Sequence, residues 1–310
     1  MKFELTILGS GSSIPSNRNS AAQVLHVLGR YFLIDCAEAT QHQLRRFHVP
    51  YNKINHIFIS HLHGDHFFGL IGFLSTLSLQ GRRGEMHIYA EPRLQELIGC
   101  QMKILHSRFT FPLFFHALSR REEVIYEDKV VTVTAFPLKH HYDTPVSGFL
   151  FREKERERTI LKDRTAAWNV PIAFMQYLKR GEDFITPEGE IVANELLTVA
   201  PPPARSFAYM TDTLFRERFA DYVRGVDLLY HEATYMNADA VLAKESYHST
   251  TGQAARIAEL AGVGKLLLGH FSARYTECSE LLAEAREVFP NTFLCSDGDL
   301  FEVPAVKRRS

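Results

Sequence analysis

The sequence predicts an α/β fold, and two observations support that prediction. Short apolar segments with the composition of buried strands alternate with segments of helical periodicity along most of the 310-residue chain. Histidine or aspartate stands at or just past the carboxyl end of an apolar segment near positions 61, 140, 212, 231 and 270. Because an α/β fold gathers such strand ends along one edge of a sheet, we expect these positions to meet there.

The first elements are strands. Phe3–Leu8 alternates apolar and polar side chains, and the loop Gly9–Ser13 follows it. No Gly-Lys-Ser/Thr or Gly-x-Gly-x-x-Gly pattern accompanies this loop, so we interpret it as a tight turn lining a site and not as a phosphate-binding loop. Gln23–Leu28 and Tyr31–Asp35 are predicted to pair as a hairpin, and a helical pattern then runs to Phe47.

Four metal-capable side chains follow the next predicted strand, His56–Ile59: they are His61, His63, Asp65 and His66. Neutral imidazole and carboxylate groups suit zinc and similar divalent ions. Histidines at i and i+2 can share one ion while the adjacent aspartate and histidine face a second. The spacing therefore predicts a two-metal site, with ions about 3.5–4 Å apart, of the kind that hydrolyses phosphate esters. The alternative is a polar turn with incidental histidines.

The middle of the chain continues the alternation and then changes composition. The next predicted elements are a helix over 69–79, a basic turn over 80–84, a strand over 86–90, a helix over 93–105 and strands over 124–126, 130–136 and 148–151. Between positions 152 and 164, ten of thirteen residues are charged, and Pro201–Pro203 ends this region. We expect an insertion over about 153–203, whose charged run is either a solvated helix or loop or an arm that reaches a partner.

The regular pattern resumes after the insertion. Predicted strands over 206–210, 227–230 and 265–269 end at Asp212, His231 and His270 respectively. A helix over 252–261 begins after Ser249–Thr251, which can supply its N-cap oxygen. A helix over 277–288 and a strand over 291–295 complete the prediction.

Composition narrows the class of protein. Apolar residues make up 45% of the chain, charged residues 23%, and the net charge is −1, which is ordinary for a soluble globular protein and predicts no strong overall field. The four cysteines form no Cys-x-x-Cys pair, so any zinc must be held by histidine and aspartate. The amino-terminal residues read as a strand and not as a signal peptide, and no apolar run reaches the ~18 residues of a membrane span. We expect a cytoplasmic protein.

Seven segments of the chain stand out together: Gly9–Ser12, Asp35–Gln41, Phe58–His66, Thr211–Thr213, His231–Thr234, His248–Thr250 and His270–Tyr275. In this order they resemble segments of the metallo-β-lactamase superfamily and, within it, of the ribonuclease Z family. The resemblance implies a four-layer αββα fold, with two mixed sheets packed face to face and helices outside. It also implies a single domain over 1–310 that carries the inserted arm at about 153–203.

The resemblance also implies a set of metal ligands for two zinc ions, with manganese as an alternative. The residues that match the family's ligands are His61, His63 and His140 for one ion, Asp65, His66 and His270 for the other, and Asp212 as the bridge. His141 is the alternative to His140, because the chain carries two extra residues before Gly148. His231 is interpreted as structural and not as a ligand.

The same resemblance implies catalytic roles for four residues. Asp65 matches the proton acceptor, His248 a histidine near the scissile phosphate, Glu232 a supporting acid and Arg274 an arginine that could meet a phosphate oxygen. The implied activity is that of an endoribonuclease that removes the 3′ trailer from precursor tRNA, leaving a 3′-hydroxyl on the tRNA and a 5′-phosphate on the trailer. A homodimer is implied as well.

Two departures from the family pattern keep alternatives open. Ala37 stands in place of a glycine, and Val170–Ala173 lacks the Gly-Pro that short ribonucleases Z carry before the Leu178–Gly181 step. That stretch grips tRNA in the family, although Lys179 and Arg180 can still contact phosphates. The alternatives are a phosphodiesterase acting on small phosphodiesters or cyclic nucleotides, and a metal-binding scaffold without catalysis.

Overall fold

The computed structural model describes residues 2–14, 16–141 and 143–303, which fall into two compact units. The larger unit comprises residues up to 152 together with those from 205 onward, and the smaller comprises 153–204. The bounds of the smaller unit are close to those of the insertion expected at about 153–203. In the described residues, no helix combines the length and the apolar character that crossing a bilayer requires.

The larger unit contains two seven-stranded mixed sheets. The first has the order β18-β1-β2-β3-β4-β5-β6, in which β3 to β6 are parallel and β18, β1 and β2 pair antiparallel with their neighbours. Its strands are β1 (Phe3–Gly9), β2 (Ala22–Val27), β3 (Arg30–Ile34), β4 (Ile54–Phe58), β5 (Met86–Ala90), β6 (Leu113–Ala117) and β18 (Leu300–Glu302).

The second sheet has the order β17-β16-β15-β14-β9-β8-β7, with β14 to β17 parallel. Its strands are β7 (Glu123–Glu127), β8 (Val131–Lys139), β9 (Pro145–Glu153), β14 (Ser206–Met210), β15 (Leu228–Glu232), β16 (Lys265–Gly269) and β17 (Thr292–Leu294). The parallel strands of both sheets end on the side of the unit that carries the predicted metal ligands.

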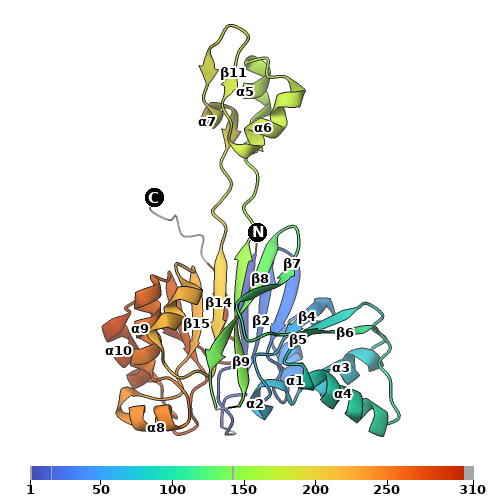
Figure 1. Ribbon diagram of the computed structural model, residues 1–310, viewed down its shortest axis with the longest axis vertical. Coiled ribbons are helices and arrows are strands. Elements are labelled where there is room, and N and C mark those ends of the chain that lie inside the picture. Colours follow the sequence, from blue (N-terminus) through green and yellow to red (C-terminus); the bar gives the residue numbers. More distant parts are fainter. Residues whose placement is uncertain (1, 15, 142, 304–310) are drawn as a thin grey trace. The chain divides into compact units, whose positions relative to one another are not determined.

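Helices cover the outer face of each sheet (Figure 1). Against the first sheet lie α1 (Thr40–Arg46), the 3₁₀ turn Tyr51–Lys53, α2 (Gly64–Phe67), α3 (Leu70–Leu79) and α4 (Arg93–Ile104). Against the second lie the 3₁₀ helices Glu217–Val223 and Asn237–Asp239 and the helices α8 (Ala240–Glu245), α9 (Thr251–Ala261) and α10 (Ser279–Val288). The predicted αββα arrangement is confirmed.

Three apolar clusters hold the four layers together. One lies between the sheets and is rich in aromatic residues, including Phe32, Phe58, Phe151 and Tyr209. The other two lie between each sheet and its helices. A strand whose two faces are both buried, each against a different apolar cluster, has a nearly continuous apolar sequence. For this reason β14, β15 and β16 were predicted within two residues of their bounds.

Helix α9 shows how local sequence fixes an element. Thr250 Oγ1 accepts a hydrogen bond from the Gln253 backbone N–H, and Gln253 Oε1 accepts one from the Thr250 N–H. This capping box, worth about 1 kcal/mol, places the N-cap within the predicted Ser249–Thr251.

The strands β6 and β18 and the helix α8 were not predicted.

The smaller unit has a core of its own. Leu178, Phe184, Val192 and Leu197 are buried together, and Trp168 packs against them. Its elements are β10 (Thr159–Ile160), α5 (Lys162–Ala167), the 3₁₀ turn Ile172–Phe174, α6 (Met175–Arg180), β11 (Phe184–Ile185), β12 (Ile191–Val192), α7 (Asn194–Leu197) and β13 (Thr198–Val199).

Candidate metal centre

The loop after β4 is held rigidly at both ends. The Ile59 N–H donates to the Tyr89 carbonyl at 2.9 Å, and the Cys36 N–H donates to the His66 carbonyl at 2.7 Å. Gly69 closes the loop against the chain at residue 37, because a Cβ at this position would lie 1.8 Å from the Ala37 carbonyl oxygen. Only glycine fits this close approach, so the loop presents its side chains in one arrangement.

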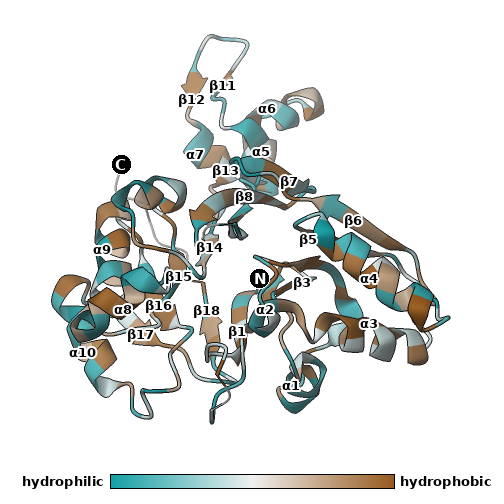
Figure 2. Ribbon diagram, turned by 60° about the horizontal axis from the view of Figure 1, so that its bottom comes forward, coloured by the Kyte–Doolittle hydropathy of each residue, from teal (hydrophilic) through white to brown (hydrophobic). Residues whose placement is uncertain are grey.

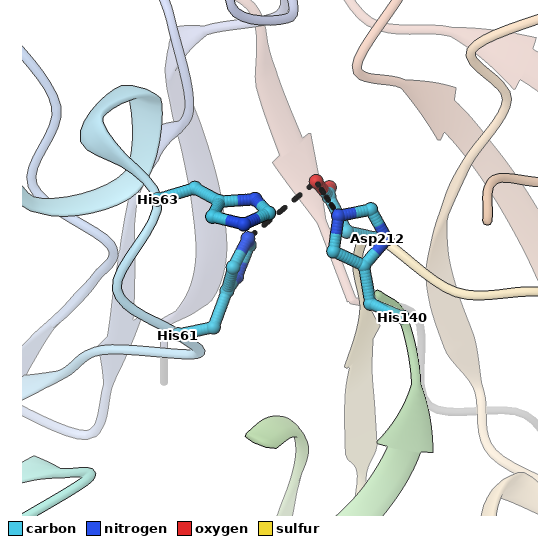
Figure 3. A group of neighbouring side chains, drawn as sticks. All are labelled: His61, His63, His140 and Asp212. Atoms are coloured by element: carbon cyan, nitrogen blue, oxygen red, sulfur yellow. Dashed lines mark ion pairs between the residues drawn. The ribbon is translucent and has the colours of Figure 1, made fainter. Parts of the chain in front are cut away.

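One group of side chains gathers on this loop and on the ends of two strands of the other sheet (Figure 3). His61, His63, His140 and Asp212 each offer a ligand atom, and these atoms all lie within 4.8 Å of one another. His61 Nε2 lies 3.6 Å, and His140 Nε2 3.8 Å, from Asp212 Oδ2. Asp212 and His140 follow β14 and β8, so both sheets contribute to the group.

A second group consists of Asp65, His66 and His270. His66 Nε2 and His270 Nε2 lie 3.3 Å apart, and they lie 3.4 and 3.2 Å from Asp212 Oδ1. The two carboxylate oxygens of Asp212 thus face different groups, which is the geometry that a bridging ligand requires. All seven residues predicted as ligands are therefore brought together.

The outer nitrogens of four of these histidines are engaged. His61 Nδ1 lies 3.0 Å from Ser60 Oγ, and His66 Nδ1 lies 2.8 Å from Asp35 Oδ2. His140 Nδ1 lies 2.8 Å from the Tyr247 carbonyl, and His270 Nδ1 lies 3.0 Å from Thr234 Oγ1. Such contacts fix the ring and leave Nε2 directed inward, as in histidines that bind metals. His61 Nε2 is buried and has no hydrogen-bond partner among the described residues. A divalent cation fits this donor set.

The protonation of the centre also fits a cation. Burial and the nearby His66 lower the pKa of His61 well below its ordinary value, so its lone pair is available. For Asp212, burial would raise the pKa, but His270 and His66 lower it well below its ordinary value. Burial opposes protonation of His66, yet Asp212 and Asp35 raise its pKa well above the ordinary value. A bound cation would take the place of that proton.

Asp35 was not predicted as a site residue. It is fully buried at the end of β3, with φ 56° in the left-handed region that aspartate tolerates. Its carboxylate accepts hydrogen bonds from Ser60 N and Oγ at 2.7 and 2.9 Å and from the Tyr209 hydroxyl at 2.7 Å, and it contacts His66 Nδ1. The signal that revealed Asp212, an acid directly after an apolar strand, could have revealed Asp35.

Buried Glu232 and partly buried His248 form a pair beside the metal groups. Glu232 accepts hydrogen bonds from the N–H groups of Thr213, Thr234 and Ser249, and its Oε1 lies 3.1 Å from His248 Nδ1. Burial would raise the pKa of Glu232, but His248 lowers it to about 2. Burial would lower the pKa of His248, but Glu232 and Asp212 raise it to about 9. Glu232 thus fixes the Nδ1 side of the His248 ring, and its negative charge favours the protonated imidazole.

Two further histidines, His141 and His231, and Arg274 were also considered as site residues. His141 is exposed, whereas His140 is buried within the first group. His231 is buried with Nδ1 2.6 Å from the Glu232 carbonyl, and it belongs to none of the groups of metal-capable side chains found among the described residues. Arg274, which the resemblance implies at the site, lies next to Tyr235, whose ring centroid is 6.1 Å from that of His248. Its Nη1 lies 3.2 Å from Asp239 Oδ1, and its guanidinium lies over the Tyr235 ring.

The chain is similar to several known proteins. It is 46% identical over 298 residues to ribonuclease Z of Bacteroides fragilis, an alignment that covers 96% of this chain and 97% of the relative. The solved structure of the short form of human tRNase Z has a TM-score of 0.69 at 27% identity, covering 97% of this chain and 99% of that one. The metallo-β-lactamase-fold protein YhfI of Bacillus subtilis has a TM-score of 0.67 at 19% identity, covering 97% and 98%.

A family model described as anti-Pycsar protein Apyc1 matches residues 3–167, which include β1 to β9 and the His61–His66 loop. The full-length similarity to ribonuclease Z extends through Asp212, Glu232, His248 and His270, which lie beyond that model. The chain therefore belongs to the ribonuclease Z family and has the metallo-β-lactamase fold.

Proposed function

We propose that this protein is a metal-dependent endoribonuclease that removes the 3′ trailer from precursor tRNA. The observation that carries the proposal is the placement of Asp212 between two groups of metal-capable side chains, with the Glu232–His248 pair beside them. Membership of the ribonuclease Z family, and the similarity to human tRNase Z, favour precursor tRNA as the substrate.

We propose two Zn²⁺ ions per chain, with Mn²⁺ as the alternative, because imidazole and carboxylate suit both. His61, His63 and His140 would hold one ion, Asp65, His66 and His270 the other, and Asp212 both. When bound, such ions polarise a phosphoryl oxygen and lower the pKa of a bound water toward ~7.

The chain's own residues supply the proton transfers. Asp65, whose carboxylate lies 3.4 Å from His270 Nε2, accepts the proton of the water that attacks phosphorus. As the bond from phosphorus to the 3′-oxygen breaks, His248 donates a proton to that oxygen. The products are a 3′-hydroxyl on the tRNA and a 5′-phosphate on the trailer. Glu232 keeps His248 protonated and oriented. Arg274 Nη1 is paired with Asp239 Oδ1, so contact between this guanidinium nitrogen and a phosphate requires that the ion pair with Asp239 opens.

A phosphodiesterase acting on small phosphodiesters is the second candidate function. Residues 153–204 contain seven Lys or Arg against nine Asp or Glu, a net charge of −2. Lys179 pairs with Glu157 at 3.2 Å. A unit with this charge balance offers a polyanion little net attraction, which favours a small substrate unless another surface binds RNA.

A cleavage assay with purified protein separates these functions. A 3′-extended precursor tRNA and a small phosphodiester such as bis(p-nitrophenyl) phosphate are compared with and without chelator. We expect cleavage of the precursor at the end of the acceptor stem, abolished by chelator and by Asp65→Ala with unchanged circular dichroism. Asp221→Ala, a substitution of an exposed aspartate, is the matched control and should retain activity. Preference for the small ester would favour the second function, and activity on neither would indicate a scaffold.

We further propose a cytoplasmic homodimer. Phe68, the residue directly after α2, is 59% exposed, and Leu97 on α4 is 40% exposed. Both line a pocket of about 100 Å³. Burial of this apolar surface against a second copy would stabilise the dimer by the hydrophobic effect. Light scattering on Leu97→Glu should then report a monomer, and a monomeric unmodified protein would contradict the proposal.

A further inference from the structure

One stretch of the larger unit carries cationic groups without acidic ones. From position 97 to 121 the chain contains no Asp or Glu, but it contains Lys103, Arg108, Arg120 and Arg121. The stretch runs from α4 through the edge strand β6, at the end of the first sheet (Figure 1). Within the described part of the chain, the guanidinium groups of Arg108, Arg120 and Arg121 form no ion pair.

Aromatic and imidazole rings form two stacked rows across β4, β5 and β6. In one row the ring centroids of Phe58 and Tyr89 are 4.6 Å apart and those of Tyr89 and His116 are 4.5 Å apart, with interplanar angles of 10° and 13°. The registers pair these residues directly across the strands. Rings at consecutive paired positions stack in this way because their Cβ atoms point to the same face.

The second row consists of His56, His87 and Phe114, with centroids 5.1 Å apart at each step and interplanar angles of 18° and 16°. His87 Nδ1 also lies 3.0 Å from His116 Nε2, which links the rows. Both rows end on β6, where Phe114 is 42% exposed and His116 is exposed. In residues 2–14, 16–141 and 143–303, no further ring stacks on the outer side of either.

A free ring face flanked by arginines is the combination that binds single-stranded nucleic acid. Stacking on an aromatic side chain suits any base, because every base has a π-face, and cationic groups track the phosphates. Sheets whose exposed aromatic residues stack bases are a recurrent RNA-binding device. Apolar residues colour most of β6 brown in Figure 2, so this edge of the sheet is an apolar strip.

We propose that Phe114 and His116 bind unpaired bases of the RNA substrate, with Arg108, Arg120 and Arg121 on its phosphates. This inference rests on the proposed function and identifies where a single-stranded extension of the precursor lies. Strands β4, β5 and β6 are parallel, so His116, near the carboxyl end of β6, lies toward the same end of the sheet as His61, which follows the carboxyl end of β4. Two strand spacings, about 10 Å, separate His116 from Phe58, which is the last residue of β4 and stands three residues before His61. An RNA segment that leaves the metal centre therefore has a short path to β6.

The test measures binding of a fluorescent ten-nucleotide oligoadenylate to the full chain by anisotropy, in EDTA so that no RNA is cut. Phe114→Ala should raise the dissociation constant about 5- to 160-fold, the range of one base stack. Phe293→Ala is the matched control, since Phe293 is 36% exposed on β17, an edge strand of the other sheet. It should leave the dissociation constant unchanged.

Three results would overturn the proposal. The unmodified protein could fail to bind the oligonucleotide. Phe114→Ala could bind it as the unmodified protein does. Phe114→Ala could also alter the oligomeric state, which would identify β6 as a contact between copies of this chain. Cleavage of a precursor with a one-nucleotide trailer, measured in parallel, should be equal in Phe293→Ala and the unmodified protein. Absence of that cleavage in both would refute the proposed function separately.

Discussion

Replacement of Asp35 by asparagine tests whether the metal centre depends on a residue that would not touch the metal. Oδ1 of Asp35 accepts only from the Ser60 backbone N–H, whereas Oδ2 faces Ser60 Oγ, Tyr209 OH and His66 Nδ1. An asparagine has one oxygen and one NH₂ group, so it can satisfy only one side.

Either orientation of the asparagine has a cost. With NH₂ toward the Ser60 N–H, two donors face each other in a buried site, which costs about 1–3 kcal/mol. With NH₂ toward His66 Nδ1, the amide donates to that nitrogen and the ring proton moves to Nε2, the atom that faces His270 and Asp212. That tautomer cannot bind a cation, and loss of such a supporting contact weakens metal binding about 10- to 100-fold.

The assay combines metal competition against a chromophoric chelator with thermal unfolding. Asp227→Asn is the control, because a single oxygen, Asp227 Oδ2, accepts from both Ser206 N and Oγ at 2.7 Å, so the oxygen of an asparagine can keep both bonds and no histidine is involved. Asp35→Asn should be destabilised and lose metal affinity, whereas Asp227→Asn should largely retain both. Unchanged metal affinity in Asp35→Asn, or equal loss in the two variants, would refute this reasoning.

The remaining predictions concern three other positions. Glu232→Gln should lower kcat about 10²- to 10⁴-fold with little change in KM, because both carboxylate oxygens accept backbone N–H groups and His248 would lose its partner; single-turnover kinetics check this. Burial and neighbouring histidines lower the pKa of His56 to about 4, so the unfolded chain binds the proton first. Stability should therefore fall as pH drops from 6.5 toward 4, and His56→Phe should flatten that dependence in urea titrations. Gly148→Ala would place a Cβ 2.2 Å from the Phe136 ring, and calorimetry should show a loss of about 1–3 kcal/mol.

Local sequence determined much of this protein. Strands buried on both faces read as apolar runs, so β5, β14 and β16 were predicted with their observed bounds. Because the parallel strands of both sheets end on one side, an acid or histidine after such a run is already a site candidate, as with Asp212 and His270. The resemblance to ribonuclease Z extended this to the complete ligand set.

Short or amphipathic elements were harder to predict. Strand β6 alternates half-buried and exposed residues at a sheet edge, and β18 has three residues, so neither carries a continuous apolar signal. Both are fixed by pairing with β5 and β1. The compact core of residues 153–204 was hidden by the charged run that precedes it.

What a side chain contacts across the fold was decided only by the tertiary structure. The strand-end pattern indicated Asp212, and the resemblance to ribonuclease Z indicated Arg274, as residues near a phosphodiester site, but neither showed which atoms they would meet. The fold directs the two oxygens of Asp212 to different groups, and it pairs Arg274 with Asp239, 35 residues away in the chain. It also joins Asp35 to His66 and Tyr209, the latter 174 residues away. Hydrogen bonds between residues so distant in sequence leave no periodic pattern, because their geometry exists only once the two sheets have packed.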